Sequence, residues 1–480
     1  MTKRIISVLL ALVLVLALST SALAATINVT NAVQGETYNA YKVFALTTSG
    51  SDSFAYQIVE EWREFFTTGA GAKYVKIDAN GGVVKTEEFT TTTAAQLAKD
   101  AIAYAESKGI KPAGSAKAEG TDPNGARKSI AINVTDPGYY LVDTNIGSLM
   151  VLGTVTDSKE INDKNDIPTI DKKITNSDVI SGTDNEKNSA CVGDIVEYSI
   201  PFQAKKNSVT LKMEDTLSKG LTYEGSLVVT ADGVELTEGT HYTAKTSNQS
   251  VVIEFSYENY LKNVTEADQA IVVTYKAKVN DDAVIGTEGN PNTVKLIFGR
   301  DGKIETLPQT VITYVFSLNV NKVNDRGTKL ADAKFQLFAT EADAEAETNP
   351  LKFDKLADNQ YKLSEDGQVT TITTDATGAF NVAGFGAGTY YVVETEAPAG
   401  YNKLTAPVTV TITAAADGTC TISAENGTIS NGDTLTVLNQ SGTVLPETGG
   451  IGTTIFYVAG GLLVAAAVVL LVTRKRVSEN

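Results

Sequence analysis

The segment "VFSLNVNKVND" (315–325) has the alternating pattern of a β-strand, with one residue that does not fit. Leu318, Val320 and Lys322 share one parity, and successive side chains of a strand point to opposite faces. The face with the two apolar residues should be buried, which takes Lys322 into the core with them. A buried ammonium without a partner is unfavourable. The segment therefore predicts a strand of a β-sandwich whose buried lysine interacts or reacts with a partner group.

Two later segments supply reaction partners for this lysine. In "TYYVVETEAPAGY" (389–401), Glu394 shares the parity of the apolar residues. In "DTLTVLNQSG" (433–442), Asn439 likewise shares the parity of the apolar residues. Burial favours the neutral forms of both an amine and a carboxylic acid. We therefore expect Lys322 to attack the Asn439 carboxamide while Glu394 shuttles protons and ammonia leaves. The alternative is a buried lysine held only by an ion pair with Glu394.

A second set of the same residue types lies upstream. Lys172 has the parity of its apolar neighbours in "PTIDKKI" (168–174), with Lys173 as the second choice. Asp215 and Asn292 share parity with apolar residues of two later strands, and Asn290 is the second choice for the amide. We expect a bond from Lys172 to Asn292 with Asp215 as the acid. The alternative is a set of polar residues at strand edges with no bond.

Most of the remaining chain also predicts strands. Short runs rich in Val, Ile, Thr and Tyr alternate with Gly, Asn and Asp turns, as in residues 250–257, 270–279, 388–396 and 406–414. Two helices are predicted near the N-terminus, at 53–66 and at 93–109, the second ending at Gly109. The predicted fold is mainly β, with tandem immunoglobulin-like β-sandwich domains and helical insertions in the first.

Both ends of the chain have the composition of export signals. Lys3 and Arg4, an apolar run and "SALA" (21–24) predict a secretory signal peptide. Residues 453–473 carry no charge, are long enough to cross a bilayer, and precede "RKR" (474–476). The expected organisation is a signal peptide (1–24), a first module (25–165), a middle module (166–314), a third module (315–442), and a sorting signal with transmembrane segment and basic tail (443–480).

Composition excludes several classes of function. The net charge of −17 argues against a nucleic-acid partner. His241 is the only histidine, and the sequence shows neither a metal-ligand cluster nor a phosphate-binding glycine loop, so we expect no cofactor, no metal and no enzyme acting on an external substrate. Cys191 and Cys420 lie far apart in the sequence and predict no disulfide framework.

Three segments carry a resemblance to known domains. "NVNKVND" (319–325), "YYVVETEAPAGY" (390–401) and "VLN" (437–439) resemble a collagen-adhesin B-type domain, with Val392 in place of the leucine of that motif. The resemblance implies an isopeptide bond between the first-strand lysine and the last-strand asparagine, with Glu394 as the catalytic acid.

The first two modules resemble the domains of major fimbrial subunits. The middle module is similar to their isopeptide-forming middle domain, in which an aspartate, here Asp215, is the catalyst. "GETYNAYKVFAL" (35–46) and "DPGYYLVDT" (136–144) resemble their N-terminal domain, and we expect no internal crosslink there.

The C-terminal stretch resembles the three-part cell-wall sorting signal of Gram-positive bacteria. It consists of a pentapeptide, an apolar span and a basic stop, and the pentapeptide residues are Leu445, Pro446, Glu447, Thr448 and Gly449. The resemblance implies that a sortase cysteine attacks the Thr448 carbonyl, releases Gly449 onward and passes the acyl group to an amine. The identity of the accepting amine determines whether the product is a wall-anchored monomer or a polymer.

For a polymer, the expected acceptor is Lys164 in "NDKND" (162–166), with Lys159 as the second choice. The Tyr-Pro-Lys-Asn motif of backbone pilins is absent there. The resemblance as a whole implies the backbone subunit of a cell-wall-anchored surface pilus that supports adhesion. Its partners would be sortase, other copies of itself, minor pilins, peptidoglycan and a host or neighbouring-cell surface. The alternative is a monomeric wall-anchored surface adhesin.

Overall fold

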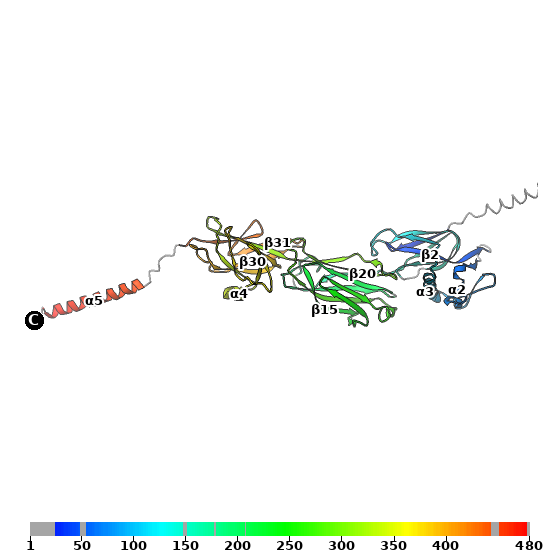
Figure 1. Ribbon diagram of the computed structural model, residues 1–480, viewed down its shortest axis with the longest axis horizontal. Helices are drawn as coiled ribbons and strands as arrows, with labels where there is room; N and C mark the ends of the chain where they lie inside the picture. The colour runs from blue at the N-terminus through cyan, green and yellow to red at the C-terminus, as the bar shows by residue number, and fades with distance from the viewer. Residues whose placement is uncertain are drawn as a thin grey trace, which may run out of the picture.

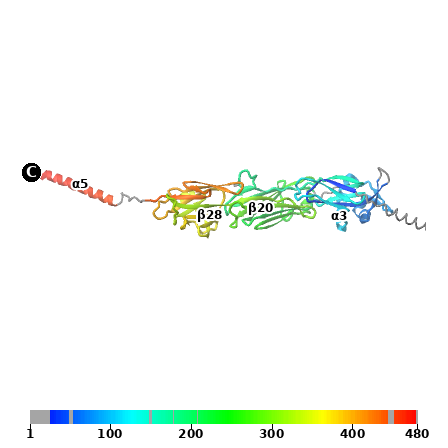
Figure 2. The same cartoon turned by 90° about the horizontal axis from the view of Figure 1, so that it is seen from above.

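The computed structural model describes residues 25–48, 54–146, 151–176, 179–206, 208–442 and 451–477. Three β-rich modules follow one another in a row, and a single helix extends from the C-terminal end (Figures 1 and 2). The prediction of a mainly β chain with helices in the N-terminal region is confirmed. The row makes the described part of the molecule a rod with its first and last modules at opposite ends.

The first module combines two sheets with short helices. Its elements are β1 Ala25–Ala32, β2 Thr37–Thr48, β3 Phe54–Ile58, η1 Glu60–Trp62, α2 Arg63–Thr67, η2 Ala70–Lys73, β4 Val75–Ile77, β5 Val83–Lys85, α3 Thr91–Lys108, β6 Gly114–Lys117, β7 Lys128–Val134, β8 Gly138–Thr144, β9 Val151–Val155 and β10 Ser158–Asn162. One sheet has the order β10-β1-β7, and the other the order β3-β2-β8-β9 with β6 beside β2. β4 and β5 pair separately.

The predicted helix at 93–109 is confirmed, whereas the prediction at 53–66 is wrong for its first half. α3 begins at a Thr90 capping box and ends at Gly109, whose φ of 66° lies in the left-handed region. The segment predicted as a helix at 53–66 instead starts as β3, which pairs antiparallel with β2, and becomes helical only from Glu60. Pairing with a neighbouring strand overrides the local helical pattern there.

The middle module is a two-sheet sandwich. Its elements are β11 Lys173–Ile174, β12 Lys187–Ser189, β13 Ile195–Ala204, β14 Leu211–Leu217, β15 Leu221–Ala231, β16 Val234–Glu235, β17 Tyr242–Ser247, β18 Ser250–Phe255, η3 Leu261–Asn263, β19 Gln269–Val279, β20 Asn290–Phe298, β21 Ile304–Glu305 and β22 Gln309–Tyr314. The sheet order is β11-β13-β19-β15-β16 on one side and β12-β22-β20-β14-β18-β17 on the other, with β21 beside β20. In β19, alternate residues are buried, including Val273, Tyr275 and Ala277.

The third module is a second sandwich. Its elements are β23 Phe316–Asn324, β24 Lys334–Phe338, α4 Glu341–Ala346, β25 Phe353–Ala357, β26 Gln360–Leu363, β27 Ile372–Thr373, β28 Ala379–Phe385, β29 Gly388–Glu396, β30 Val408–Ala414, β31 Cys420–Glu425, β32 Thr428–Ser430 and β33 Thr434–Asn439. The sheets run β25-β26-β28-β23-β33-β32 and β27-β24-β29-β30-β31. The first strand, β23, and the last, β33, are therefore neighbours, and they pair in parallel.

The junction between the first and middle modules combines apolar packing with an ion pair. Val33 and Ile167 pack with Phe298 and Ile304 across it. The Arg300 guanidinium pairs with the carboxylate of Asp143, which is 2% exposed. Burial raises the pKa of Asp143, and the Arg300 charge opposes that rise. The charge of the arginine thus offsets part of the cost of burying this carboxylate at the junction.

We expect Arg300→Ala to destabilise the junction by about 2–4 kcal/mol, because it leaves Asp143 buried without its counter-charge. The pKa of Asp143 should then rise further. When the pKa is raised in the folded state, the folded chain retains a proton that the unfolded chain releases. The free energy of unfolding therefore falls as the pH rises above the pKa of the unfolded chain, about 4. The loss of thermal stability in the variant should therefore be larger at neutral pH than in mild acid. An equal loss at both would contradict this role for Asp143.

The junction between the middle and third modules combines hydrogen bonds with an ion pair between Lys278 and Glu365. Val192 N donates to Gly384 O at 2.9 Å. The Cys191 Sγ lies 3.2 Å from the Tyr390 hydroxyl. Cys191 and Cys420 are both free, so no disulfide joins them.

The C-terminal helix α5, Ile451–Val477, contains a segment suited to a bilayer. Phe456–Arg474 has a mean hydropathy of 2.4, and its side chains are exposed. An exposed apolar helix of this length matches the predicted transmembrane segment. The predicted signal peptide (1–24) and the pentapeptide residues 445–449 lie outside the described residues.

Candidate functional site

The third module brings Lys322, Glu394 and Asn439 together in its core, with each residue at most 1% exposed. Lys322 lies on β23 and Asn439 at the end of the adjacent β33, while Glu394 reaches in from β29 in the facing sheet. The Lys322 amine donates to the Asn439 carboxamide oxygen and lies 3.4 Å from Glu394 Oε1. Asn439 Nδ2 donates to the two Glu394 oxygens at 2.9 and 3.1 Å. Amine, amide and acid are thus in mutual contact.

The electrostatics of this cluster favour a reactive amine. Burial lowers the pKa of Lys322 to about 8, and the nearby Glu394 opposes the shift. A larger neutral fraction of the amine is therefore present near neutral pH than for an exposed lysine. The Leu404 backbone N–H donates to Glu394 Oε2 at 2.9 Å and fixes the carboxylate. The arrangement can support attack of the amine on the amide.

The middle module also buries a lysine, an acid and an asparagine in one cluster, Lys172, Asp215 and Asn292. Lys172 lies just before β11, whereas Asp215 on β14 and Asn292 on β20 come from the facing sheet. The Lys172 amine donates to Asp215 Oδ1 and Oδ2 at 2.6 and 2.5 Å. The side chains of the lysine and the aspartate are completely buried. The predicted parity of all three residues is confirmed.

A fourth residue, Tyr275 on β19, joins the middle-module cluster. Its hydroxyl accepts hydrogen bonds from Lys172 at 3.2 Å and from Asn292 Nδ2 at 2.7 Å, and donates to Asp215 Oδ2 at 2.9 Å. The sequence prediction missed this residue. Its inward parity in β19 was the only available signal, and that signal is equally typical of an ordinary core tyrosine.

Burial sets the charge states of the middle-module cluster. It lowers the pKa of Lys172 to about 8, against the opposing effect of Asp215. It also raises the pKa of Asp215, against the opposing effect of Lys172. The two shifts bring the pair closer to a neutral amine and a neutral acid, the state in which the amine is nucleophilic.

The second-choice residues lie elsewhere. Lys173 is partly exposed and pairs with Asp184 at 2.7 Å. Asn290 is buried, but its Nδ2 donates to the backbone oxygens of Val284 and Thr313, both at 3.1 Å. Neither of them joins the Lys172 cluster in the described structure.

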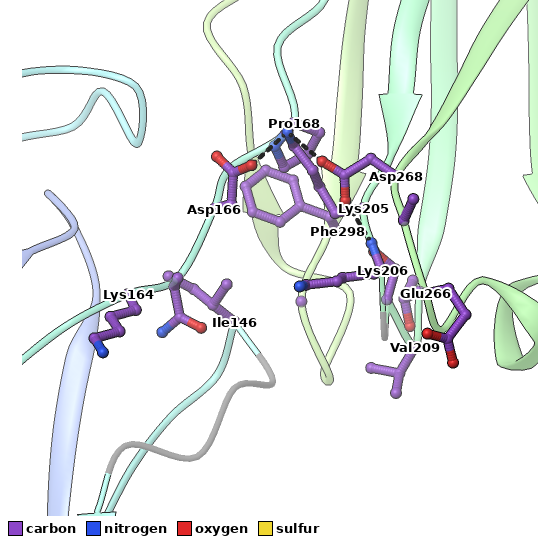
Figure 3. Close-up of a pocket in the computed structure, with 15 residues that line it drawn as sticks. Ile146, Lys164, Asp166, Pro168, Lys205, Lys206, Val209, Glu266, Asp268 and Phe298 are labelled. Carbon is purple, nitrogen blue, oxygen red and sulfur yellow. Dashed lines mark hydrogen bonds and ion pairs between the residues drawn. The ribbon is translucent and has the colours of Figure 1, made fainter.

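The expected acceptor Lys164 is exposed beside a pocket of about 360 Å³ at the junction of the first two modules. Figure 3 shows its amine pointing away from the Asp166–Lys205 ion pair. The second choice, Lys159, is also exposed, on β10. Both lysines are therefore accessible to an enzyme.

In the described structure, neither of the acidic residues close to Lys164 in sequence, Asp163 and Asp166, pairs with it. Asp163 is buried and accepts a hydrogen bond from the Tyr38 hydroxyl. Asp166 pairs with Lys205 at 2.7 Å. Burial alternates along this segment, so Asp163 points to the side opposite Lys164, where Tyr38 lies. Asp166 is on the same side as Lys164, but its partner comes from the middle module.

Three family models match parts of the chain. Residues 192–302 match the Gram-positive pilin backbone subunit 2 Cna-B-like domain, residues 316–428 a prealbumin-like fold domain, and residues 438–479 the LPXTG cell wall anchor motif. The chain is a Gram-positive backbone pilin. Pilins of this kind are structural proteins of the cell-wall-anchored surface pilus, and their family is not an enzyme family.

Two curated relatives are similar to this backbone pilin. The trypsin-resistant surface T6 protein of Streptococcus pyogenes serotype M6 is 28% identical over 275 residues, 52% of this chain and 46% of the relative. The fimbrial subunit type 2 of Actinomyces naeslundii is 27% identical over 322 residues, 59% of this chain and 57% of the relative. The matches span about half the length of these relatives.

A solved structure has the same fold. The T6 backbone pilin of serotype M6 Streptococcus pyogenes, described as a modular three-domain structure, superposes with a TM-score of 0.54 at 18% identity. The match covers 88% of this chain and 99% of that one. The likeness supports the three-module β architecture.

Proposed function

We propose that this backbone pilin is the repeating subunit of a covalent pilus and that its middle and third modules each close an internal Lys–Asn isopeptide bond. The observation that carries the proposal is the pair of buried clusters, each containing a lysine, an acid and an asparagine. A buried lysine beside a carboxamide is a costly arrangement if it remains unreacted. Reaction removes the buried amine and leaves a neutral amide.

The chemistry is a single turnover in each module. Lys322 attacks the Asn439 carboxamide with Glu394 as the proton shuttle, and Lys172 attacks Asn292 with Asp215 in that role. In each case one ammonia leaves and the acid returns to its starting state. The module acts only on itself and turns over no external substrate.

The two bonds have different mechanical consequences. Lys322 and Asn439 lie near the C-terminal ends of adjacent parallel strands, so a pulling force would pass from β23 through the bond and out of the module. The residues between these two positions, which are 117 apart in sequence, would carry no load. Asn292 is followed by β21 and β22, and that segment would still carry the force to the third module.

Between subunits, we propose that a sortase joins Thr448 of one subunit to Lys164 of the next. Such a head-to-tail link is open and yields a filament rather than a closed ring. Peptidoglycan would receive the last subunit, and minor pilins and an adhesive contact with another cell surface would complete the assembly. Support comes from the anchor motif and from the exposure of Lys164.

The experiment that tests the polymer is an immunoblot of surface extracts boiled in detergent. A covalent pilus gives a ladder of high-mass species, because neither detergent nor heat breaks an amide. A single band at the monomer position would favour the monomeric surface adhesin.

A further inference from the structure

The acid reaches the leaving nitrogen in different ways in the two clusters. In the third module, Asn439 Nδ2 contacts both Glu394 oxygens. In the middle module, Asn292 Nδ2 donates to the Tyr275 hydroxyl at 2.7 Å, and that hydroxyl donates to Asp215 at 2.9 Å. Among the described residues, no hydrogen bond joins Asp215 to Asn292. The nitrogen that must leave as ammonia therefore touches a tyrosine instead of the acid.

Side-chain length accounts for this difference. Aspartate is one methylene shorter than glutamate, and Asp215 is already held by the Lys172 amine. Tyr275 projects from β19 in the facing sheet, and its hydroxyl fills the gap between the carboxyl and the amide. The tyrosine thus extends the reach of the shorter acid.

We propose that Tyr275 is a catalytic residue of the middle module, whose hydroxyl carries a proton from Asp215 to the departing nitrogen of Asn292. The proposal rests on the isopeptide bond proposed above. No such relay is needed in the third module, where Glu394 contacts Asn439 directly.

The proton transfers balance over the reaction. The neutral Lys172 amine attacks Cγ of Asn292, giving a positive Nζ and an oxyanion. Protonated Asp215 gives its proton to the Tyr275 oxygen while Tyr275 gives its own to Nδ2. The Asp215 carboxylate then takes a proton from Nζ. Collapse of the oxyanion breaks the Cγ–Nδ2 bond and releases ammonia, with both Asp215 and Tyr275 restored.

The surroundings of Tyr275 suit a relay. The side chain is almost completely buried, and its hydroxyl is the one group that contacts lysine, aspartate and asparagine together. Burial raises the pKa of Tyr275 well above its usual value. The phenol therefore stays protonated and transfers protons by exchange instead of acting as a base.

The test uses Tyr275→Phe in the full-length chain, analysed by intact mass and by mapping of the peptides that contain Lys172 and Asn292. We expect formation of the middle-module bond to slow by roughly 100-fold, the usual scale of a lost acid–base group. The third-module bond should form normally and serves as an internal control for expression and export. Tyr223→Phe is the matched control. Its ring lies 5.8 Å from that of Tyr275, and in the described structure its hydroxyl makes no hydrogen bond to Lys172, Asp215 or Asn292.

A rescue variant separates catalysis from folding. In Asp215→Glu/Tyr275→Phe, the longer acid should reach Asn292 directly, as Glu394 reaches Asn439, and the bond should return. Wild-type rates in Tyr275→Phe, or equal slowing in Tyr223→Phe, would overturn the relay. A wild-type middle module that has lost no ammonia would instead reject the isopeptide bond itself.

Discussion

Replacing Lys164 with alanine is expected to abolish the detergent-resistant ladder while the monomer is still exported and internally cross-linked. A sortase acyl intermediate at Thr448 needs a primary amine to resolve it, and alanine offers none. Lys164 is exposed, and its amine points away from the neighbouring ion pair, so its removal should disturb no packing. The measurement is the immunoblot of boiled extracts, together with the intact mass of the monomer.

Two further variants make this result specific. Lys164→Arg keeps the positive charge but lacks the primary amine, so it should also give no ladder. Lys159→Ala removes the exposed lysine of β10 and should leave the ladder intact. A ladder that persists in Lys164→Ala and disappears in Lys159→Ala would assign the acceptor to Lys159.

The second large effect is expected for Glu394→Ala, which should leave the third module folded but without its bond. The amine and the amide remain in place, but they lose the carboxylate that contacts both of them in the described structure. By analogy with disulfides, loss of a crosslink that closes a loop of about 120 residues costs about 4–5 kcal/mol through the entropy of the unfolded chain. For a module of this size the melting temperature should fall by roughly 15 °C, and protease sensitivity should increase.

The matched control is Glu396→Ala on the same strand. Glu396 is exposed and pairs with Lys334 at 2.5 Å, and an exposed pair of this kind contributes about 1 kcal/mol or less. This variant should keep the bond and nearly all of the stability. Full loss of ammonia from the third module of Glu394→Ala would show that Glu394 is not the catalyst.

The sequence located the buried clusters because strand periodicity is a local property. Lys322, Glu394 and Asn439 each share parity with apolar neighbours, and each is buried. Their meeting depends on sheet topology, above all the parallel pairing of β23 with β33. The resemblance to a collagen-adhesin domain implied that the three side chains are in contact. The alternation of side chains along each strand could not predict that contact.

Other features could not be predicted from local pattern. Tyr275 looks like any inward core tyrosine until the facing sheet is placed. Residues 54–58 form a strand because β2 offers them a partner, and that partner lies outside their own pattern. Asp163 and Asp166 take partners from β2 and from the middle module instead of pairing with nearby Lys164.

Intact mass spectrometry of residues 25–448, the chain expected after both predicted cleavages, tests the central claim most directly. Each isopeptide bond releases one ammonia, so the measured mass should be lower than the sequence mass by two ammonia molecules. Peptide mapping should place one loss between Lys172 and Asn292 and the other between Lys322 and Asn439. A mass equal to that of the unmodified sequence would contradict both bonds at once.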